Sequence, residues 1–202
     1  MINVYQPSLG EEELDLIREV FESNWIGYGH VGGKQDEFIK KFSDRIIAES
    51  YHGVAYSCIN TNNVVAVTSC TEALFRVVDY YISDGDEVIM PSVSFVAAAN
   101  AVIQKNGKVV FCDVDKHTLN PSISDIETKI TKKTKAIILL HFAGAPCSDI
   151  LLIRKLCDDK GIILIEDNAN SPFSFYKGVS TGTIGHVGLW SFDPMKIITC
   201  GD

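Results

Sequence analysis

The feature that most restricts the fold of this chain is a repeated alternation of short apolar runs with segments of helical periodicity. The runs have the length and branched residues of buried strands, and the segments between them repeat apolar residues at helical spacing. Such alternation is typical of a parallel sheet, because a parallel crossover needs a connection about as long as a helix. The predicted strands are residues 64–67, 87–90, 109–112, 136–140 and 162–165, and the predicted helices are 11–24, 34–48, one from 71, 94–104, 122–131 and 148–159. We therefore predict an α/β fold of three layers, a mostly parallel sheet flanked by helices on both faces with right-handed crossovers.

The composition fits one enzyme-sized domain. The chain has 202 residues, of which 46% are hydrophobic and 22% charged, enough to bury one large core. Its net charge of -8 argues against a broad surface for nucleic acid or anionic membranes. The segment Met1–Pro7 has neither the basic nor the apolar part of a secretion signal, and no apolar run is long enough to span a bilayer. We therefore expect a cytoplasmic protein.

The cysteines and histidines show no metal-binding pattern. None of the six cysteines belongs to a Cys-x-x-Cys pair, and His30, His52, His117 and His186 have no ligand spacing. We expect reduced thiols and no metal site. His141 follows a predicted strand and is open to two interpretations, a hydrogen-bonded structural residue or a catalytic one.

Near the carboxyl end of the sequence, a hydroxyl and a primary amine stand five positions apart, on Ser191 and Lys196. Apolar neighbours, among them Trp190, Phe192, Met195 and two following isoleucines, would partly desolvate the amine and favour its neutral form, which attacks aldehydes. The alternative is an ordinary lysine whose stem lies on apolar surface while its ammonium reaches water. The pattern alone favours the ordinary lysine, so the decision depends on residues upstream.

Asp167 directly follows the predicted strand at 162–165 and Glu166. Its carboxylate should therefore lie at the carboxyl edge of the sheet, where open α/β sheets bind ligands. A carboxylate there can keep the ring nitrogen of a pyridine cofactor protonated, so that the ring accepts electrons. The alternative is a strand end that caps the next turn.

The turn after the predicted strand at 64–67 suits a phosphate group. Small hydroxylated residues precede a predicted helix, and Ser69 or Thr71 is a natural N-cap. The free N–H groups and positive dipole at the start of a helix bind anions. Most such turns are caps only, so this signal is weak by itself.

Taken in order, these motifs resemble the DegT/DnrJ/EryC1/StrS family of pyridoxal-phosphate-dependent sugar aminotransferases. The resemblance runs from Tyr5 to the last residue and rests on Thr68–Leu74, Gly85–Ile89, Ser94-Phe95, His141–Pro146, Glu166–Ala169 and Ser191-Phe192 with Lys196. It implies the large domain of a fold-type I transferase over residues 1–202. Family members continue through further strands into a small C-terminal domain, so the chain is expected to be truncated.

The resemblance also implies the chemistry of two residues. Lys196 would form the Schiff base with pyridoxal 5′-phosphate and later move a proton between the substrate carbon and the cofactor. Asp167 would pair with the pyridinium nitrogen. Family members that dehydrate sugars have histidine in place of this lysine, so Lys196 favours aminotransfer over dehydration.

Five further positions are implied to bind the cofactor. Phe95 would stack on its ring, Ser191 together with Cys70 and Thr71 would bind its phosphate, and Asn170 would lie near its phenolic oxygen. Cys70 replaces a usual glycine, and Asn170 is shorter than the usual histidine or glutamine. Both departures concern the fine geometry of the site.

The implied reaction is transfer of an amino group from glutamate to a keto group of a nucleotide-linked deoxysugar, for surface polysaccharides or antibiotics. The family's active site lies at a homodimer interface, with part of each phosphate site coming from a partner segment beyond residue 202. We therefore expect the 202-residue chain to associate, to hold the cofactor weakly and to show no turnover. The alternatives are a non-catalytic fragment that keeps the fold and weak cofactor binding, and a cofactor-dependent sugar dehydratase.

Two loops complete the expectations. Residues 27–32 match the dinucleotide-binding pattern G-x-G-x-x-G, but they follow a predicted helix, whereas that motif requires a preceding strand. A loop bordering the substrate cleft is the preferred interpretation. Residues 50–63 are polar and mixed, which predicts a long mobile loop.

Overall fold

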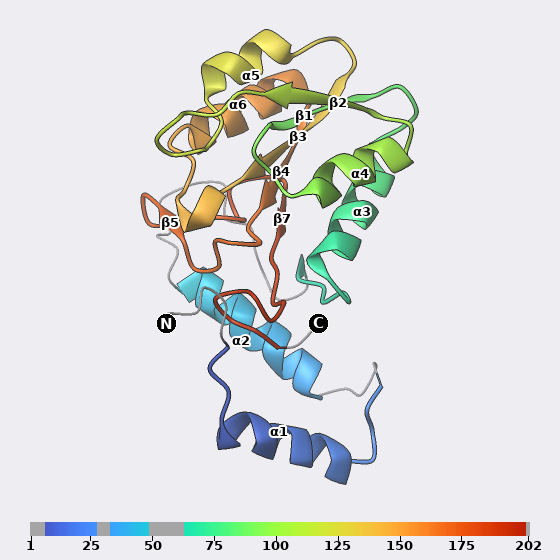
Figure 1. Ribbon diagram of the computed structural model, residues 1–202, viewed down its shortest axis with the longest axis vertical. Coiled ribbons are helices and arrows are strands. Elements are labelled where there is room, and N and C mark those ends of the chain that lie inside the picture. Colours follow the sequence, from blue (N-terminus) through green and yellow to red (C-terminus); the bar gives the residue numbers. More distant parts are fainter. Residues whose placement is uncertain (1–6, 28–32, 49–62, 201–202) are drawn as a thin grey trace.

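Five parallel strands form the centre of the fold, in the order β2-β1-β3-β4-β7 (Figure 1). The strands are β1 (Glu87–Pro91), β2 (Lys108–Cys112), β3 (Thr134–Leu140), β4 (Ile163–Asp167) and β7 (Val187–Leu189). Every pairing between these neighbours is parallel. The computed structural model describes residues 7–27, 33–48 and 63–200, and in this part of the chain the predicted parallel sheet is confirmed.

Helices cover both faces of the sheet (Figure 1). One face carries α3 (Cys70–Tyr81) and α4 (Val96–Gln104), and the other carries α5 (Ile123–Lys129) and α6 (Ile150–Lys160). Successive side chains of a strand point to opposite faces, so adjacent residues of β3 enter different cores. Ile138 packs with the first pair of helices, whereas Ile137 packs with the second. The predicted three-layer arrangement is therefore confirmed.

Two further helices, α1 (Glu11–Glu22) and α2 (Lys34–Ala48), lie beyond one end of the sheet (Figure 1). No residue of α1 is buried, and α2 buries Phe42, Ser43 and Ile46. The ring centroid of Phe42 lies 5.3 Å from that of Trp190 and 5.2 Å from that of Phe192. These aromatic contacts join α2 to the segment that follows β7. In the described ranges, no helix combines the length and apolar character needed to cross a membrane.

Two local predictions differ from the structure. Residues 64–67 do not form a strand, since none of the strands described here pairs with them, and a strand requires a neighbour for its backbone hydrogen bonds. An unpredicted hairpin joins β5 (Phe175–Tyr176) to β6 (Val179–Ser180). Its turn residues Lys177 and Gly178 have φ values of 51° and 81°, as two-residue hairpin turns require.

The glycine motif at 27–32, except Gly27, and the expected loop at 50–63, except Asn63, lie outside the described residues.

The start of α3 is fixed by Ser69, one of the two N-caps predicted. Its Oγ accepts a hydrogen bond from the Glu72 N–H at 3.1 Å. Ser122 caps α5 in the same way, through the Asp125 N–H at 3.3 Å. The cap on α3 matters most for function, because this helix starts beside the cavity described below.

We predict that Ser69→Ala lowers the free energy of unfolding by about 1 kcal/mol, because one N–H at the helix start loses its acceptor. Ser122→Ala should cost a similar amount and serves as a cap control on a different helix. Urea denaturation of both variants measures the effect. Unchanged stability in Ser69→Ala would show that water replaces the cap at no cost.

Candidate active site

A cavity of about 1750 Å³ lies at the carboxyl edge of the sheet. Leu140, Asp167 and Leu189 line it, and they are the last residues of β3, β4 and β7. Its other walls come from residues 63–71, the start of α4, the turn before β7, the segment after β7, and parts of α1 and α2. This is the edge at which parallel α/β sheets bind ligands.

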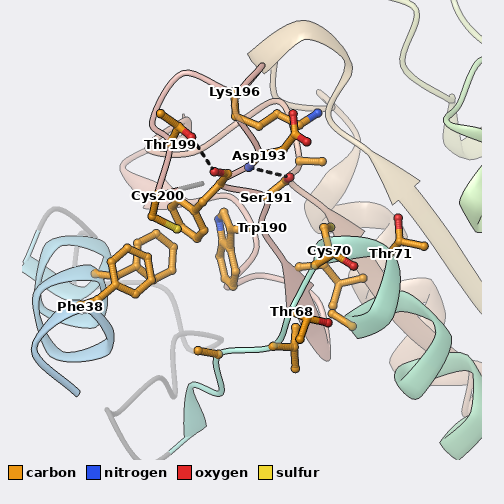
Figure 2. Close-up of a pocket in the computed structure, with 18 of the residues that line it drawn as sticks. Phe38, Thr68, Cys70, Thr71, Trp190, Ser191, Asp193, Lys196, Thr199 and Cys200 are labelled. Atoms are coloured by element: carbon orange, nitrogen blue, oxygen red, sulfur yellow. Dashed lines mark hydrogen bonds between the residues drawn. The ribbon is translucent and has the colours of Figure 1, made fainter. Parts of the chain in front are cut away.

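All seven positions predicted to bind a cofactor line this one cavity: Lys196, Asp167, Phe95, Ser191, Cys70, Thr71 and Asn170. They come from the start of α3, the residue before α4, the end of β4 and the segment after β7. Figure 2 shows Cys70 and Thr71 on one wall, with Ser191 and Lys196 on another. The fold thus brings together residues that are separated by more than a hundred positions in the sequence.

The Asp167 carboxylate is buried and receives few hydrogen bonds that would offset the cost of its burial. It is 5% exposed, and its Oδ1 accepts one hydrogen bond, from the Ala169 N–H at 3.0 Å. Burial raises the pKa of this carboxyl above its ordinary value, and the Ala169 N–H and Lys196 oppose that rise only in part. A cationic partner in the cavity would stabilise the ionised form, so this carboxylate suits a protonated ring nitrogen.

Lys196 lies in the turn after β7, and its surroundings agree in part with the expectation. The flanking Met195 and Ile197 are 58% and 74% exposed, so these neighbours do not enclose the amine. A contact distant in sequence orients the side chain instead, because Nζ donates a hydrogen bond to Asn170 Oδ1 at 3.2 Å. Lys196 itself is half-buried. This half-burial agrees with a partly desolvated amine, although Met195 and Ile197 are themselves largely exposed.

Two neighbouring parts of the cavity wall, Ser191 and the start of α3, suit an anion. Ser191 is buried at the cavity, and its Oγ accepts a hydrogen bond from the Asp193 N–H at 3.5 Å (Figure 2). Cys70 and Thr71 stand in the first turn of α3, where backbone N–H groups have no partner within the helix. Burial raises the pKa of the Cys70 thiol to about 12, with a further contribution from Asp167. A protonated thiol adds no negative charge that would repel a phosphate.

Two buried polar atoms at the cavity lack hydrogen-bond partners in the described structure, Ser94 Oγ and Trp190 Nε1. An unpaired buried group of this kind costs about 1–3 kcal/mol. Phe95, which follows Ser94, leaves 67% of its surface exposed at the same cavity. An uncovered aromatic face beside unused polar groups fits a flat, polar, aromatic ligand, and the residues present therefore fit pyridoxal phosphate.

His141 lies beneath the cavity and is not part of its lining. It is fully buried, its Nε2 bonds Glu166 Oε2 at 2.9 Å, and its Nδ1 accepts the Cys147 N–H at 3.1 Å. Of the two interpretations left open, this geometry favours the structural one. Sequence reasoning did not assign a role to Gly182 or Trp190, although both line the cavity. The glycines at 182, 185 and 188 were a usable signal, since glycine in or near strands marks close backbone packing.

No group of three histidine, cysteine, aspartate or glutamate side chains in the described residues could hold a metal ion. The groups that line the cavity include an amine, a carboxylate, hydroxyls and backbone N–H groups. A primary amine near a buried carboxylate, with an anion site on a neighbouring wall, is an arrangement suited to a phosphorylated aldehyde.

Comparison with protein families identifies the chain. The model of the DegT/DnrJ/EryC1/StrS aminotransferase family matches residues 7–202. The chain belongs to this family. The predicted resemblance is confirmed over nearly the whole sequence.

Individual relatives agree with the family. The chain is 43% identical over 203 residues to dTDP-4-dehydro-2,3,6-trideoxy-D-glucose 4-aminotransferase of Saccharopolyspora spinosa, covering 100% of this chain and 49% of that protein. It is 38% identical to GDP-perosamine synthase of Escherichia coli O157:H7, covering 100% and 51%. The crystal structure of the aminotransferase TlmJ from Streptoalloteichus hindustanus superposes with a TM-score of 0.90 at 42% identity, covering 100% of this chain and 51% of that one. The chain thus spans about half the length of the relatives it matches.

We predict that Asp167→Asn stabilises the cofactor-free protein at neutral pH. The folded pKa is raised above the unfolded value, so the ionised form costs stability, and this cost grows as the pH rises from the unfolded pKa towards the folded one. The gain should vanish at a pH below the ordinary carboxylate pKa of about 3.9. Asp115→Asn is the control with the opposite sign, because the N–H groups of Thr118 and His117 lower the pKa of Asp115. Urea denaturation at both pH values decides, and destabilisation by Asp167→Asn at neutral pH would contradict the prediction.

We also predict that Cys70 resists alkylation although it lines the cavity. The thiolate is the reactive form, and burial raises the pKa of this thiol to about 12. At mildly alkaline pH its iodoacetamide reaction should be at least ~10³-fold slower than that of an unperturbed thiol, whose pKa is about 8.5. Peptide mapping before and after unfolding measures this, and the unfolded chain is the control. Rapid labelling of Cys70 in the folded protein would disprove the assignment.

Proposed function

We propose that residues 1–202 form the cofactor-binding large domain of a pyridoxal-phosphate-dependent sugar aminotransferase. The reaction is transfer of an amino group from glutamate to a keto group of a nucleotide-linked deoxysugar. One observation carries this proposal: the Lys196 amine, the buried Asp167, the exposed Phe95 ring and the start of α3 line a single cavity. The named activities of the two sugar-modifying relatives support the substrate class.

Each residue has a defined part in this reaction. Pyridoxal phosphate supplies an aldehyde for the lysine and a ring that accepts electrons. Lys196 would hold the aldehyde end of the cofactor, and its free amine would carry a proton to and from the reacting substrate carbon. Asp167 holds a proton on the ring nitrogen, and its burial strengthens that interaction because little water competes.

The remaining cavity residues bind and orient. Phe95 would stack on the ring, and Ser191 with the first turn of α3 at Cys70-Thr71 would receive the phosphate. Asn170 approaches the phenolic oxygen and, in this structure, accepts a hydrogen bond from the Lys196 amine. Binding at both ends of the ring would fix its position relative to Lys196.

The wider setting follows from the family. We propose a cytoplasmic homodimer that contributes to polysaccharide or antibiotic sugar synthesis. A lysine at position 196, where dehydrating members have histidine, favours aminotransfer over dehydration.

We predict that, in the complete protein, borohydride reduction in the presence of pyridoxal phosphate fixes the cofactor to Lys196. Lys196→Ala should abolish the visible absorbance of the lysine-bound cofactor and all turnover, while circular dichroism stays unchanged. Lys177→Ala, at an exposed lysine on the β5–β6 turn, is the matched control and should keep the adduct. Recovery of the adduct on another lysine would exclude Lys196 from this role.

We predict that, in the complete protein, Asp167→Asn binds the cofactor but loses at least ~10²-fold in turnover, the usual effect of one electrostatic group in a water-excluded site. The amide cannot carry the negative charge that keeps the ring nitrogen protonated. Turnover with glutamate and a nucleotide-linked keto-sugar is the measurement. Near-normal turnover would remove Asp167 from the mechanism.

A further inference from the structure

We propose that Glu166 is a positioning residue that, together with His141, fixes the phosphate-binding side of the cavity. It acts by holding the turn at residues 182–185, on which Trp190 and β7 rest. The identity of the ligand used in the test rests on the proposed function, whereas the positioning itself does not.

Four hydrogen-bond donors converge on the Glu166 carboxylate, which is fully buried. Oε1 accepts the N–H of Ile184 at 2.8 Å and the N–H of Gly185. Oε2 accepts the N–H of Gly182 at 2.8 Å and bonds His141 Nε2 at 2.9 Å. The carboxylate thus ties the end of β3 and the body of β4 to the turn at 182–185.

The bonding of His141 shows why this position needs a carboxylate. Nδ1 of His141 accepts the Cys147 N–H at 3.1 Å, so the proton of the ring must be on Nε2, which faces Glu166. All four groups around Glu166 are therefore donors. An ionised carboxylate accepts on both oxygens, whereas an amide of the same shape would direct its own hydrogens at two of these donors.

The turn held by Glu166 is packed tightly against the elements that lead to the cavity. Gly182 has a φ of 86°, and a Cβ on it would overlap the indole ring of Trp190. A Cβ on Gly188, in β7, would overlap the backbone of Gly182. A shift of this turn therefore displaces both β7 and the Trp190 ring, because the turn is packed against both without free space.

Trp190 connects the turn at 182–185 with the predicted phosphate site. Its ring packs against Phe42 with centroids 5.3 Å apart, and the next residue in the chain is Ser191. In Figure 2, Trp190 lies between the aromatic group that includes Phe38 and the wall formed by Thr68 and Cys70. A displaced Trp190 would move the Ser191 hydroxyl relative to the start of α3.

Glu166 and Asp167 are adjacent residues of β4 with different surroundings. Adjacent strand residues point to opposite faces, and Asp167 lines the cavity whereas Glu166 does not. A change at Glu166 should therefore disturb the phosphate side through the turn at 182–185, while leaving the carboxylate of Asp167 in the cavity.

The test uses Glu166→Gln in the full-length protein, with Trp25→Phe as background, and the emission of Trp190 is taken as the part of the spectrum that a Trp190→Phe variant of the same protein loses. Pyridoxal phosphate and pyridoxal share the aldehyde and differ in the phosphate, so the ratio of their dissociation constants reports the phosphate site. Trp190 emission reports the position of the ring without any ligand. Glu87→Gln is the matched control, because Glu87 is a buried carboxylate at the opposite end of the sheet, bonded to Lys108 and Thr131.

We expect Glu166→Gln to shift Trp190 emission and to reduce the preference for pyridoxal phosphate over pyridoxal about tenfold, as for one lost hydrogen bond to a charged group. Glu87→Gln should change thermal stability only. Wild-type emission and a wild-type ratio in Glu166→Gln would overturn the proposal, and so would equal changes in Glu87→Gln.

Two further outcomes are also decisive. If Glu166→Gln does not fold, His141→Gln, which alters one of the four donors, should shift emission and the ratio in the same direction by a smaller amount. No change in His141→Gln would then overturn the proposal. If the wild-type protein does not distinguish the two ligands, the proposed cofactor role of the cavity fails, and Trp190 emission alone decides the positioning role.

Discussion

Parallel pairing of strands that are covered on both faces governs where polar chemistry occurs in this protein. β1, β3 and β4 are enclosed by helices above and below, so their middle residues are apolar, and polar groups are tolerated mainly where the strands end. Parallel strands end at the same edge, which brings Asp167 close to residues from other strands and helices. The cavity at this edge follows from the order of the strands, and its chemistry follows from the few polar residues placed there.

The two adjacent carboxylates of β4 differ in how many hydrogen bonds the protein gives them, and this difference distinguishes a structural group from one available to a ligand. Glu166 has four donors and no access to the cavity, so its bonding capacity is used within the protein. Asp167 accepts one backbone N–H, and burial raises its pKa. A carboxylate that the protein leaves undercompensated is available to a ligand, and such groups concentrate at functional sites. Mutation of the two residues should therefore disturb different properties of the same site.

Sequence reasoning predicted the elements whose cause is local and missed those whose cause is distant. Apolar periodicity predicted the helices and strands from residue 70 to 167 closely, because it reflects the face each element buries. It failed at 64–67, where the strand pattern exists without a partner strand in the described structure. Local patterns singled out Lys196, Ser191, Asp167 and Thr71, and the family resemblance added Phe95, Cys70 and Asn170. The roles of all seven stay predictions. The bonds from Glu166 to residues 182–185 span 16 to 19 positions and join backbone groups, which no side-chain pattern reveals. The hydrogen bond from Lys196 to Asn170 was missed because it also joins residues distant in sequence. In an irregular segment, sequence neighbours do not predict the surroundings of a side chain.

The two sides of the cavity are held with different rigidity, and this difference suits the proposed chemistry. Asp167 stands on a strand paired on both sides, beside the buried network of Glu166. Lys196 stands in a turn with exposed neighbours, and one side-chain hydrogen bond orients its amine. The partner of a ring nitrogen must keep its position throughout a reaction, because its effect depends on a preorganised charge. A Schiff-base lysine must instead bind the cofactor, leave it and return with a proton, which requires a side chain that moves between partners. In the proposed function the partner of the ring nitrogen therefore stands on the sheet and the Schiff-base lysine on the loop, where Asn170 Oδ1 accepts a hydrogen bond from its amine.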